Sequence, residues 1–218
     1  MKALPLLVVA LLAGLSYPIS WGIELAPAAA IAWKGAGVGL LALWAAQQGR
    51  TANHRLLATV LALGAVADMV LEVNFIAGAA IFALGHVVAI ALYLRNRRHT
   101  PYARITAPLL ILGSVTLGIM LAPPDMRAPV AVYTLFLASM AAAAGLSRFP
   151  VAATGALLFL ASDLLIFARM TMLATASWPT LAIWLLYFSG QALIAWGVVS
   201  VLQKKHLRRE GVSSPRMN

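Results

Sequence analysis

The sequence predicts an all-α, polytopic membrane protein built as a bundle of eight transmembrane helices. Of its 218 residues, 62% are hydrophobic and only 10% are charged, a composition that a soluble domain of this size does not show. The apolar residues form eight runs of about 17 to 22 residues, close to the ~20 that a helix needs to cross the hydrocarbon core. Because the connections are short, residues 1–202 are expected to form a single transmembrane domain.

The predicted spans follow one another with little sequence between them. The first could be taken for a signal peptide because Lys2 precedes it, but no clear A-x-A site follows, so we expect it to be retained. A turn near Asn74 makes the third and fourth spans a tight hairpin. The predicted spans cover residues 3–20, 27–47, 56–73, 75–94, 105–122, 128–146, 150–168 and 180–202.

The basic residues predict the orientation of the bundle. Of the 16 Lys and Arg residues, 13 fall at one side, whereas Arg127 and Arg169 fall at the other and Lys34 lies within a span. Positive residues favour the cytoplasmic side, which places both termini there in a bacterial-type inner membrane. The net charge of +10 therefore indicates membrane orientation rather than a nucleic-acid partner. Residues 203–218 are predicted to be a disordered, basic cytoplasmic tail.

Polar residues inside the spans point to one buried site. Asp163 lies in the apolar run ALLFLASDLLIFARM, where a charge at helix centre costs roughly 2.5 to 3.5 kcal/mol on insertion scales. With a rise of 1.5 Å per residue, several such residues lie about 8 to 11 Å below the outer surface. Six spans therefore predict one pocket in the outer half of the bundle. Its candidates are Lys34, Asp68, Glu72, Tyr133, Asp163 and Tyr187, with His86 and Gln191 near mid-membrane.

Ordinary structural roles are the alternative for each candidate. His86 is also typical of a hydrogen-bonded interior residue, and Tyr187 and Gln191, four residues apart, could only join helices. Glu72 lies close enough to the surface to be solvated. The two aspartates and Lys34 could form a structural ion-pair triad.

Metal-dependent catalysis and catalysis by a serine nucleophile have little support in the sequence. The chain contains no cysteine, and the remaining histidines, His54, His99 and His206, are expected on cytoplasmic loops, so no metal site and no cofactor are predicted. A metal bound by carboxylates alone stays an alternative. Ser162 adjoins Asp163, but no G-x-S-x-G motif is present.

Two functions without a catalytic site are alternatives for the buried polar residues. A proton-coupled transporter or carrier also needs buried Asp, Lys and His, although no proline-broken helix pair occurs at matched positions and the polar layer stops short of the cytoplasmic face. A purely structural scaffold would leave the buried charges unexplained.

The two halves of the chain resemble each other at two places. AVADMVL around Asp68 is similar to FLASDLLI around Asp163, and GHVVAIALYL from Gly85 is similar to GQALIAWGVV from Gly190. These matches are consistent with a parallel 4+4 repeat, which would relate the two aspartates by a pseudo-twofold axis.

Several segments resemble the YhhN family of lysoplasmalogenase-like membrane proteins, over nearly the whole chain. The most specific are GALLFLASDLLI and YFSGQALI; the others are AAIAWKGAG, LGAVADMVL, IFALGHVVAI and APVAVYTLFLASM. Glu72 is not part of this resemblance. The resemblance implies an eight-span hydrolase that splits the vinyl ether of lysoplasmalogen into a fatty aldehyde and a glycerophospho-headgroup. The expected partners are this lysophospholipid substrate and the membrane lipids.

The residue chemistry is compatible with such a reaction. A vinyl ether breaks when an acid protonates its carbon and water attacks the resulting oxocarbenium ion, so the site needs a proton donor and a base. Asp68 and Asp163 can supply both roles, in either order. Lys34 could keep one carboxylate charged or meet the lipid phosphate. His86, Tyr133, Tyr187 and Gln191 are expected to position water or to support the aspartates.

Overall fold

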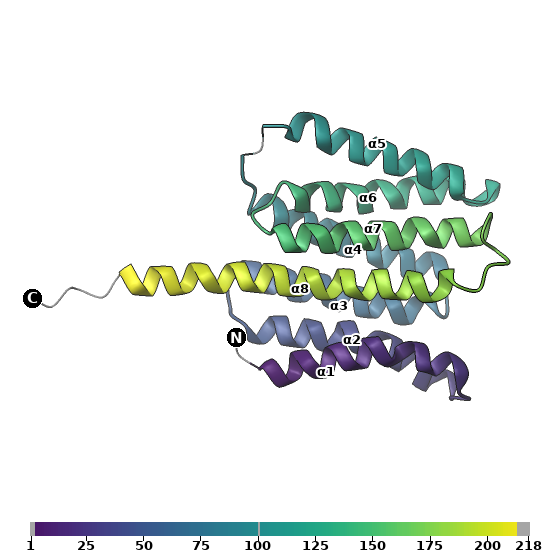
Figure 1. The fold of residues 1–218 in the computed structure, drawn as a ribbon, viewed down its shortest axis with the longest axis horizontal. Helices are drawn as coiled ribbons and strands as arrows, with labels where there is room; N and C mark the ends of the chain where they lie inside the picture. Colours follow the sequence, from purple (N-terminus) through teal and green to yellow (C-terminus); the bar gives the residue numbers. More distant parts are fainter. Residues whose placement is uncertain (1–2, 100, 213–218) are drawn as a thin grey trace, which may run out of the picture.

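The computed structural model describes residues 3–99 and 101–212, with side chains described as far as Lys204, and within them it contains helices and no strands. The helices run in alternating directions along one axis (Figure 1). Their bounds are α1 Leu4–Ser16, α2 Pro27–Gln47, α3 Ala52–Leu71, α4 Phe75–Leu94, α5 Ala103–Leu121, α6 Arg127–Gly145, α7 Pro150–Met170 and α8 Pro179–Val212, with short 3-10 helices η1 Tyr17–Gly22 and η2 Pro124–Met126.

The prediction of eight spans is confirmed, because eight of the described helical segments are long and apolar enough to cross a membrane. The predicted ends of the second and fourth spans match α2 and α4. The third begins at Ala52, four residues earlier than predicted, which places His54 in the first turn of α3 rather than on a loop.

The predicted disordered tail is corrected over most of its length. Helix α8 continues to Val212, so residues 203–212, including His206, belong to a helix; residues 213–218 lie outside the described residues. Gln203 donates a hydrogen bond to Gln48 Oε1 at 2.8 Å, which ties this extension of α8 to the end of α2.

Local sequence signals explain where the helices begin. Helices α2, α7 and α8 each open with a proline, whose fixed φ suits the first helical turn and whose missing N–H is not needed there. Asn74 caps α4, because its side-chain oxygen accepts a hydrogen bond of 2.9 Å from Ala77 N. This cap allows α3 and α4 to form the predicted tight hairpin.

The helices pack mainly against their neighbours in sequence. Between the two halves of the chain, α4 packs against α6, and α8 packs against α2 and α3. In a parallel 4+4 repeat α4 corresponds to α8 and α2 to α6, so these contacts agree with the pseudo-twofold arrangement. The repeat stays a prediction. Helix α5 lies at the edge of the bundle (Figure 1), with 11% of its span buried.

Small residues bring α7 and α8 into close contact. A Cβ atom added to Gly190 would lie 2.7 Å from the carbonyl oxygen of Gly155, and one added to Gly197 would lie 2.5 Å from the backbone nitrogen of Ala152. Close backbone approach at small residues is the usual means of packing helices in a membrane. This contact joins the two helices that carry Asp163 and Tyr187.

Candidate functional site

The two aspartates line the same cavity. Its volume is about 440 Å³, and its walls come from α2, α3, α4, α7, α8 and η1. Asp68 is 2% exposed and Asp163 is 6% exposed. The rim includes the exposed residues Trp21, Glu72 and Arg169, so the cavity opens at the end of the bundle that carries the α7–α8 connection, opposite the C-terminus (Figure 1).

Asp68 lies closer to the end of its helix than the predicted span placed it. Asp68 lies three residues before Leu71, the last residue of α3, whereas the sequence placed it about six residues from the outer end. Asp163 lies seven residues before Met170, the last residue of α7. Asp68 is nevertheless buried, because side chains of α2, α7 and α8 surround it in the cavity.

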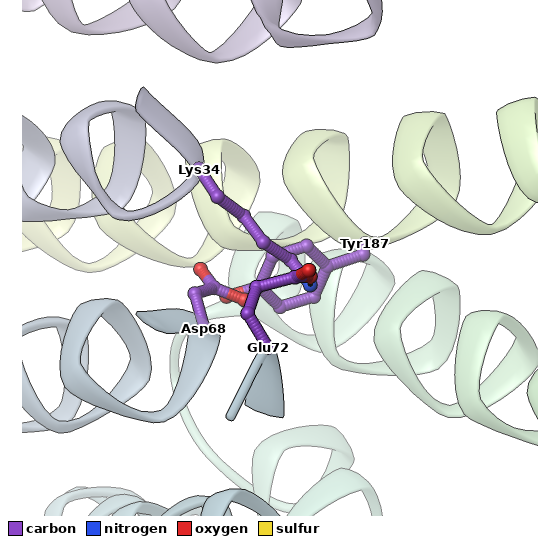
Figure 2. A network of polar contacts seen from close by, with 4 residues as sticks. All are labelled: Lys34, Asp68, Glu72 and Tyr187. Carbon is purple, nitrogen blue, oxygen red and sulfur yellow. Dashed lines mark hydrogen bonds and ion pairs between the residues drawn. The ribbon is translucent and has the colours of Figure 1, made fainter. Parts of the chain in front are cut away.

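Asp68 is held by a tyrosine from α8. Tyr187 Oη donates a hydrogen bond of 2.6 Å to Asp68 Oδ2, and Gln191 Nε2 donates to Tyr187 Oη at 3.3 Å. Figure 2 shows Tyr187 reaching across from α8 to the carboxylate on α3. Tyr187 and Gln191 are one helical turn apart, so the amide lies behind the tyrosine and not at the cavity wall.

Asp163 has a tyrosine partner of its own, from α6. Tyr133 Oη donates a hydrogen bond of 2.5 Å to Asp163 Oδ2, and His86 Nε2 lies 3.4 Å from Tyr133 Oη. With the hydroxyl hydrogen directed at Asp163, the Nε2-protonated tautomer of His86 would donate to the tyrosine oxygen. This gives a chain from His86 on α4 through Tyr133 to Asp163.

The surroundings of the two aspartates are therefore not equivalent. The repeat aligns Tyr187 with Phe82 and Gln191 with His86, yet the partner of Asp163 comes from α6 rather than from α4. The Phe82 ring instead packs edge-on against Tyr187, with centroids 5.8 Å apart. Phe159 packs against both Tyr187 and His86, so apolar rings contact both hydrogen-bonded chains.

Lys34 forms its ion pair with Glu72 and not with an aspartate. Figure 2 shows the lysine of α2 extending to Glu72, one turn beyond Asp68 on α3. The side chain of Lys34 is 16% exposed and that of Glu72 is 40% exposed. The alternative of an ion-pair triad between Lys34 and the two aspartates is thus not what the structure shows, and Glu72 is not simply solvated, because it pairs with Lys34 at the cavity mouth.

The predicted residues come together in two groups around one cavity. Asp68, Asp163, Lys34, Glu72 and Tyr187 line it, whereas His86 and Gln191 lie behind the tyrosines. Tyr133 lines a smaller cavity of about 60 Å³, which Asp163 also borders. Among the described residues, no three His, Asp or Glu side chains are grouped closely enough to hold a metal ion.

The smaller cavity gives Asp163 an apolar side. It lies between α4, α6 and α7, and its own walls include Ile76, Ala79, Met126, Pro129 and Val130. It shares five residues with the large cavity, namely Leu71, Phe75, Phe82, Asp163 and Ile166. Asp163 can therefore be approached from the polar mouth and from an apolar side.

Sequence reasoning did not place Arg169 at the site. Arg169 Nη1 donates a hydrogen bond of 3.1 Å to Thr180 Oγ1, and both residues line the large cavity. The available signal was that Arg169 is one of two basic residues on the sparsely charged side. Ser162 also lines this cavity, but its hydroxyl donates to the Ile183 carbonyl oxygen at 2.9 Å and joins α7 to α8.

Comparison with known proteins identifies the family. The model of the YhhN family matches residues 29–198, about three quarters of the chain, and this range contains every residue of both aspartate groups. Neither the curated proteins nor the solved structures give a significant match. The chain therefore belongs to the YhhN family.

Proposed function

We propose that the protein is a membrane-embedded hydrolase that cleaves the vinyl ether bond of lysoplasmalogen, releasing a fatty aldehyde and a glycerophospho-headgroup. Membership of the YhhN family, which is known in general as lysoplasmalogenase-like, supports a lipid hydrolase. The observation that carries the proposal is the pair of buried carboxylates in one cavity, each with its own tyrosine hydroxyl.

The proposed reaction uses the two carboxyl groups as an acid and a base. One carboxyl group donates its proton to the vinyl carbon that is not bonded to oxygen, which leaves an oxocarbenium ion. The other carboxylate stabilises this cation and takes a proton from the attacking water. The hemiacetal then collapses to aldehyde, and the glycerol oxygen leaves with a proton returned by the site. Water is consumed, and no redox step is needed.

The surroundings suit these roles. The cavity of about 440 Å³ can hold several water molecules, since each occupies about 30 Å³ in the liquid. The tyrosine hydroxyls fix the carboxylate oxygens, while Gln191 and His86 orient the tyrosines from behind. A positioned acid and base contribute typically about 10²- to 10⁴-fold each.

The arrangement of cavities favours hydrolysis over proton-coupled transport. The pocket at the other end of the bundle is lined by Ala46, Gly49, Arg50, Arg55, Ala58 and Thr59. It shares no residue with the aspartate cavity. Between the two pockets, α2 and α3 carry apolar side chains with no exposed surface, such as Val38, Leu41 and Leu61. A solute pathway would need polar groups in this region.

A substrate panel tests the proposal. Purified protein in detergent should release aldehyde from a 1-alkenyl lysophospholipid but leave the 1-alkyl analogue intact, because a saturated ether cannot form the oxocarbenium ion by protonation at carbon. A chelator should change the rate little. Absence of turnover on alkenyl, acyl and alkyl lysolipids, combined with proton-dependent solute flux in liposomes, would replace hydrolysis by transport.

A further inference from the structure

The mouth of the aspartate cavity carries an arginine whose charge is not used by the proposed chemistry. Arg169 lies in the last turn of α7, and Arg169 and Thr180 both border the cavity. The hydrogen bond described for its guanidinium is to the neutral Thr180 hydroxyl. An arginine has five N–H donors, so most of them stay free for a ligand.

The charges at the mouth favour an anion beside Arg169. Three charged residues line the rim in addition to the aspartates: Lys34, Glu72 and Arg169. Lys34 and Glu72 form an ion pair with each other, so their charges compensate. Among the described residues, Arg169 is therefore the charged residue of the rim that forms no ion pair.

The spacing along α7 matches the length of a glycerophospholipid headgroup. Arg169 follows Asp163 by six residues, about 9 Å along the helix axis. Five bonds of about 1.5 Å separate the ether oxygen of a 1-alkenyl lysophospholipid from its phosphorus, about 6 Å in an extended chain. The flexible arginine side chain can span the remainder. A lipid with its ether at Asp163 would thus carry its phosphate close to the guanidinium.

The apolar side of Asp163 suits the rest of such a lipid. The small cavity between α4, α6 and α7 meets the large cavity at Asp163, Ile166 and Phe82. A hydrocarbon chain passing between these helices would avoid the polar mouth altogether. The phosphate would then face Arg169, the ether would face Asp163, and the hydrocarbon chain would face the small apolar cavity.

We propose that Arg169, oriented by Thr180, binds the phosphate of the substrate. It would make the enzyme select ether lipids that carry a phosphate over ether lipids that lack one. This assignment rests on the proposed function. Guanidinium is well suited to the role, because its planar fork binds phosphate through two parallel hydrogen bonds. Arg127 is the matched control: it is exposed at the same end of the bundle but lines neither cavity.

The kinetic test compares a 1-alkenyl lysophospholipid with 1-alkenylglycerol, which lacks the phosphate. Arg169→Gln should lower kcat/KM for the phospholipid by about 10- to 100-fold, mainly through KM, as expected for the loss of a charge-assisted hydrogen bond. Its turnover of alkenylglycerol should stay within about twofold of wild type, and Arg169→Lys should recover part of the loss. Arg127→Gln should leave both substrates unaffected.

A binding test keeps the result independent of catalysis. Trp21 and Trp184 line the cavity, so their fluorescence can report binding of the uncleavable 1-alkyl lysophospholipid and of 1-alkylglycerol. Arg169→Gln should weaken binding of the phospholipid only. Glycerophosphate or inorganic phosphate alone should bind far more weakly than the phospholipid.

The outcomes separate this inference from the proposed function. Absence of aldehyde release by wild type would refute the hydrolase but not the binding result. Equal binding of both lipids by wild type, or equal weakening of both by Arg169→Gln, would overturn the role of Arg169. Binding of inorganic phosphate as tight as that of the phospholipid would show a free-anion site and overturn the assignment to a lipid headgroup.

Discussion

The close contact between α7 and α8 predicts that Gly190→Ala destabilises the bundle. The new Cβ would lie 2.7 Å from the Gly155 carbonyl oxygen and 3.1 Å from Phe159 N. Both obstacles are backbone atoms, so no side chain can rotate away, and the two helices must separate. Ordinary contact begins near 3.4 Å, so the separation needed is about 0.7 Å.

The cost follows from that separation. A gap of about 0.5 to 1 Å forfeits a quarter to a half of each dispersion contact, and overpacking typically costs about 1 to 3 kcal/mol. Alanine also gains about 1 kcal/mol of helix propensity over glycine. Gly113→Ala on α5 shares this gain without the clash, because no atom outside its own helix lies within 4 Å of the added Cβ.

The assay is reversible unfolding of both variants in mixed micelles. Gly190→Ala should be less stable than Gly113→Ala by about 1 to 3 kcal/mol. It should also lose activity, since Phe159 packs against Tyr187 with ring centroids 5.0 Å apart and Tyr187 holds Asp68. Equal stability of the two variants would refute the close approach of α7 and α8.

Three further predictions concern the site and the orientation of the bundle. Tyr133→Phe removes the hydroxyl that donates to Asp163 and should slow aldehyde release by about 10- to 100-fold. The control is Tyr93→Phe, which should change the rate little because the buried Tyr93 hydroxyl has no hydrogen-bond partner among the described residues. Equal rates for the two variants would refute a role of the Tyr133 hydroxyl in the reaction. Lys34→Met should cost about 1 kcal/mol or less of unfolding free energy, because its partner Glu72 is 40% exposed; a loss above about 3 kcal/mol would indicate a buried lysine–aspartate pair instead. A reporter fused after Gln203 should be cytoplasmic and one near Asp125 extracytoplasmic, and the opposite signals would reverse the orientation.

The number of spans was predictable because hydrophobic length is a direct consequence of bilayer thickness. The ends were less so where the helix continues into polar sequence. Helix α8 extends to Val212 although its last residues are charged, and α3 begins at Ala52 with Thr51 as its cap. Hydropathy measures where the bilayer ends, whereas hydrogen bonding decides where the helix ends.

The residues of the site were predictable because burying a polar or charged side chain in a membrane costs free energy. Which of these residues pair with one another was not predictable. Asp68 and Glu72 are one turn apart on α3, so either could meet Lys34; the position of α2 selects Glu72. Likewise the predicted repeat relates the two aspartates, yet their tyrosine partners are not equivalent, because Tyr133 comes from α6 and Tyr187 from α8. Helix rotation and packing decide such pairs, and neither can be read from spacing along one helix.

Turnover by aspartate variants tests the central claim most directly. Asp68→Asn and Asp163→Asn keep the size of the side chain and remove its acidity, so each should reduce aldehyde release by at least about 10²-fold in folded protein. The double variant should be scarcely slower than the slower single variant, because the two carboxyl groups act as a unit on one substrate. Folded single variants with near-normal turnover would contradict a catalytic role for these carboxylates.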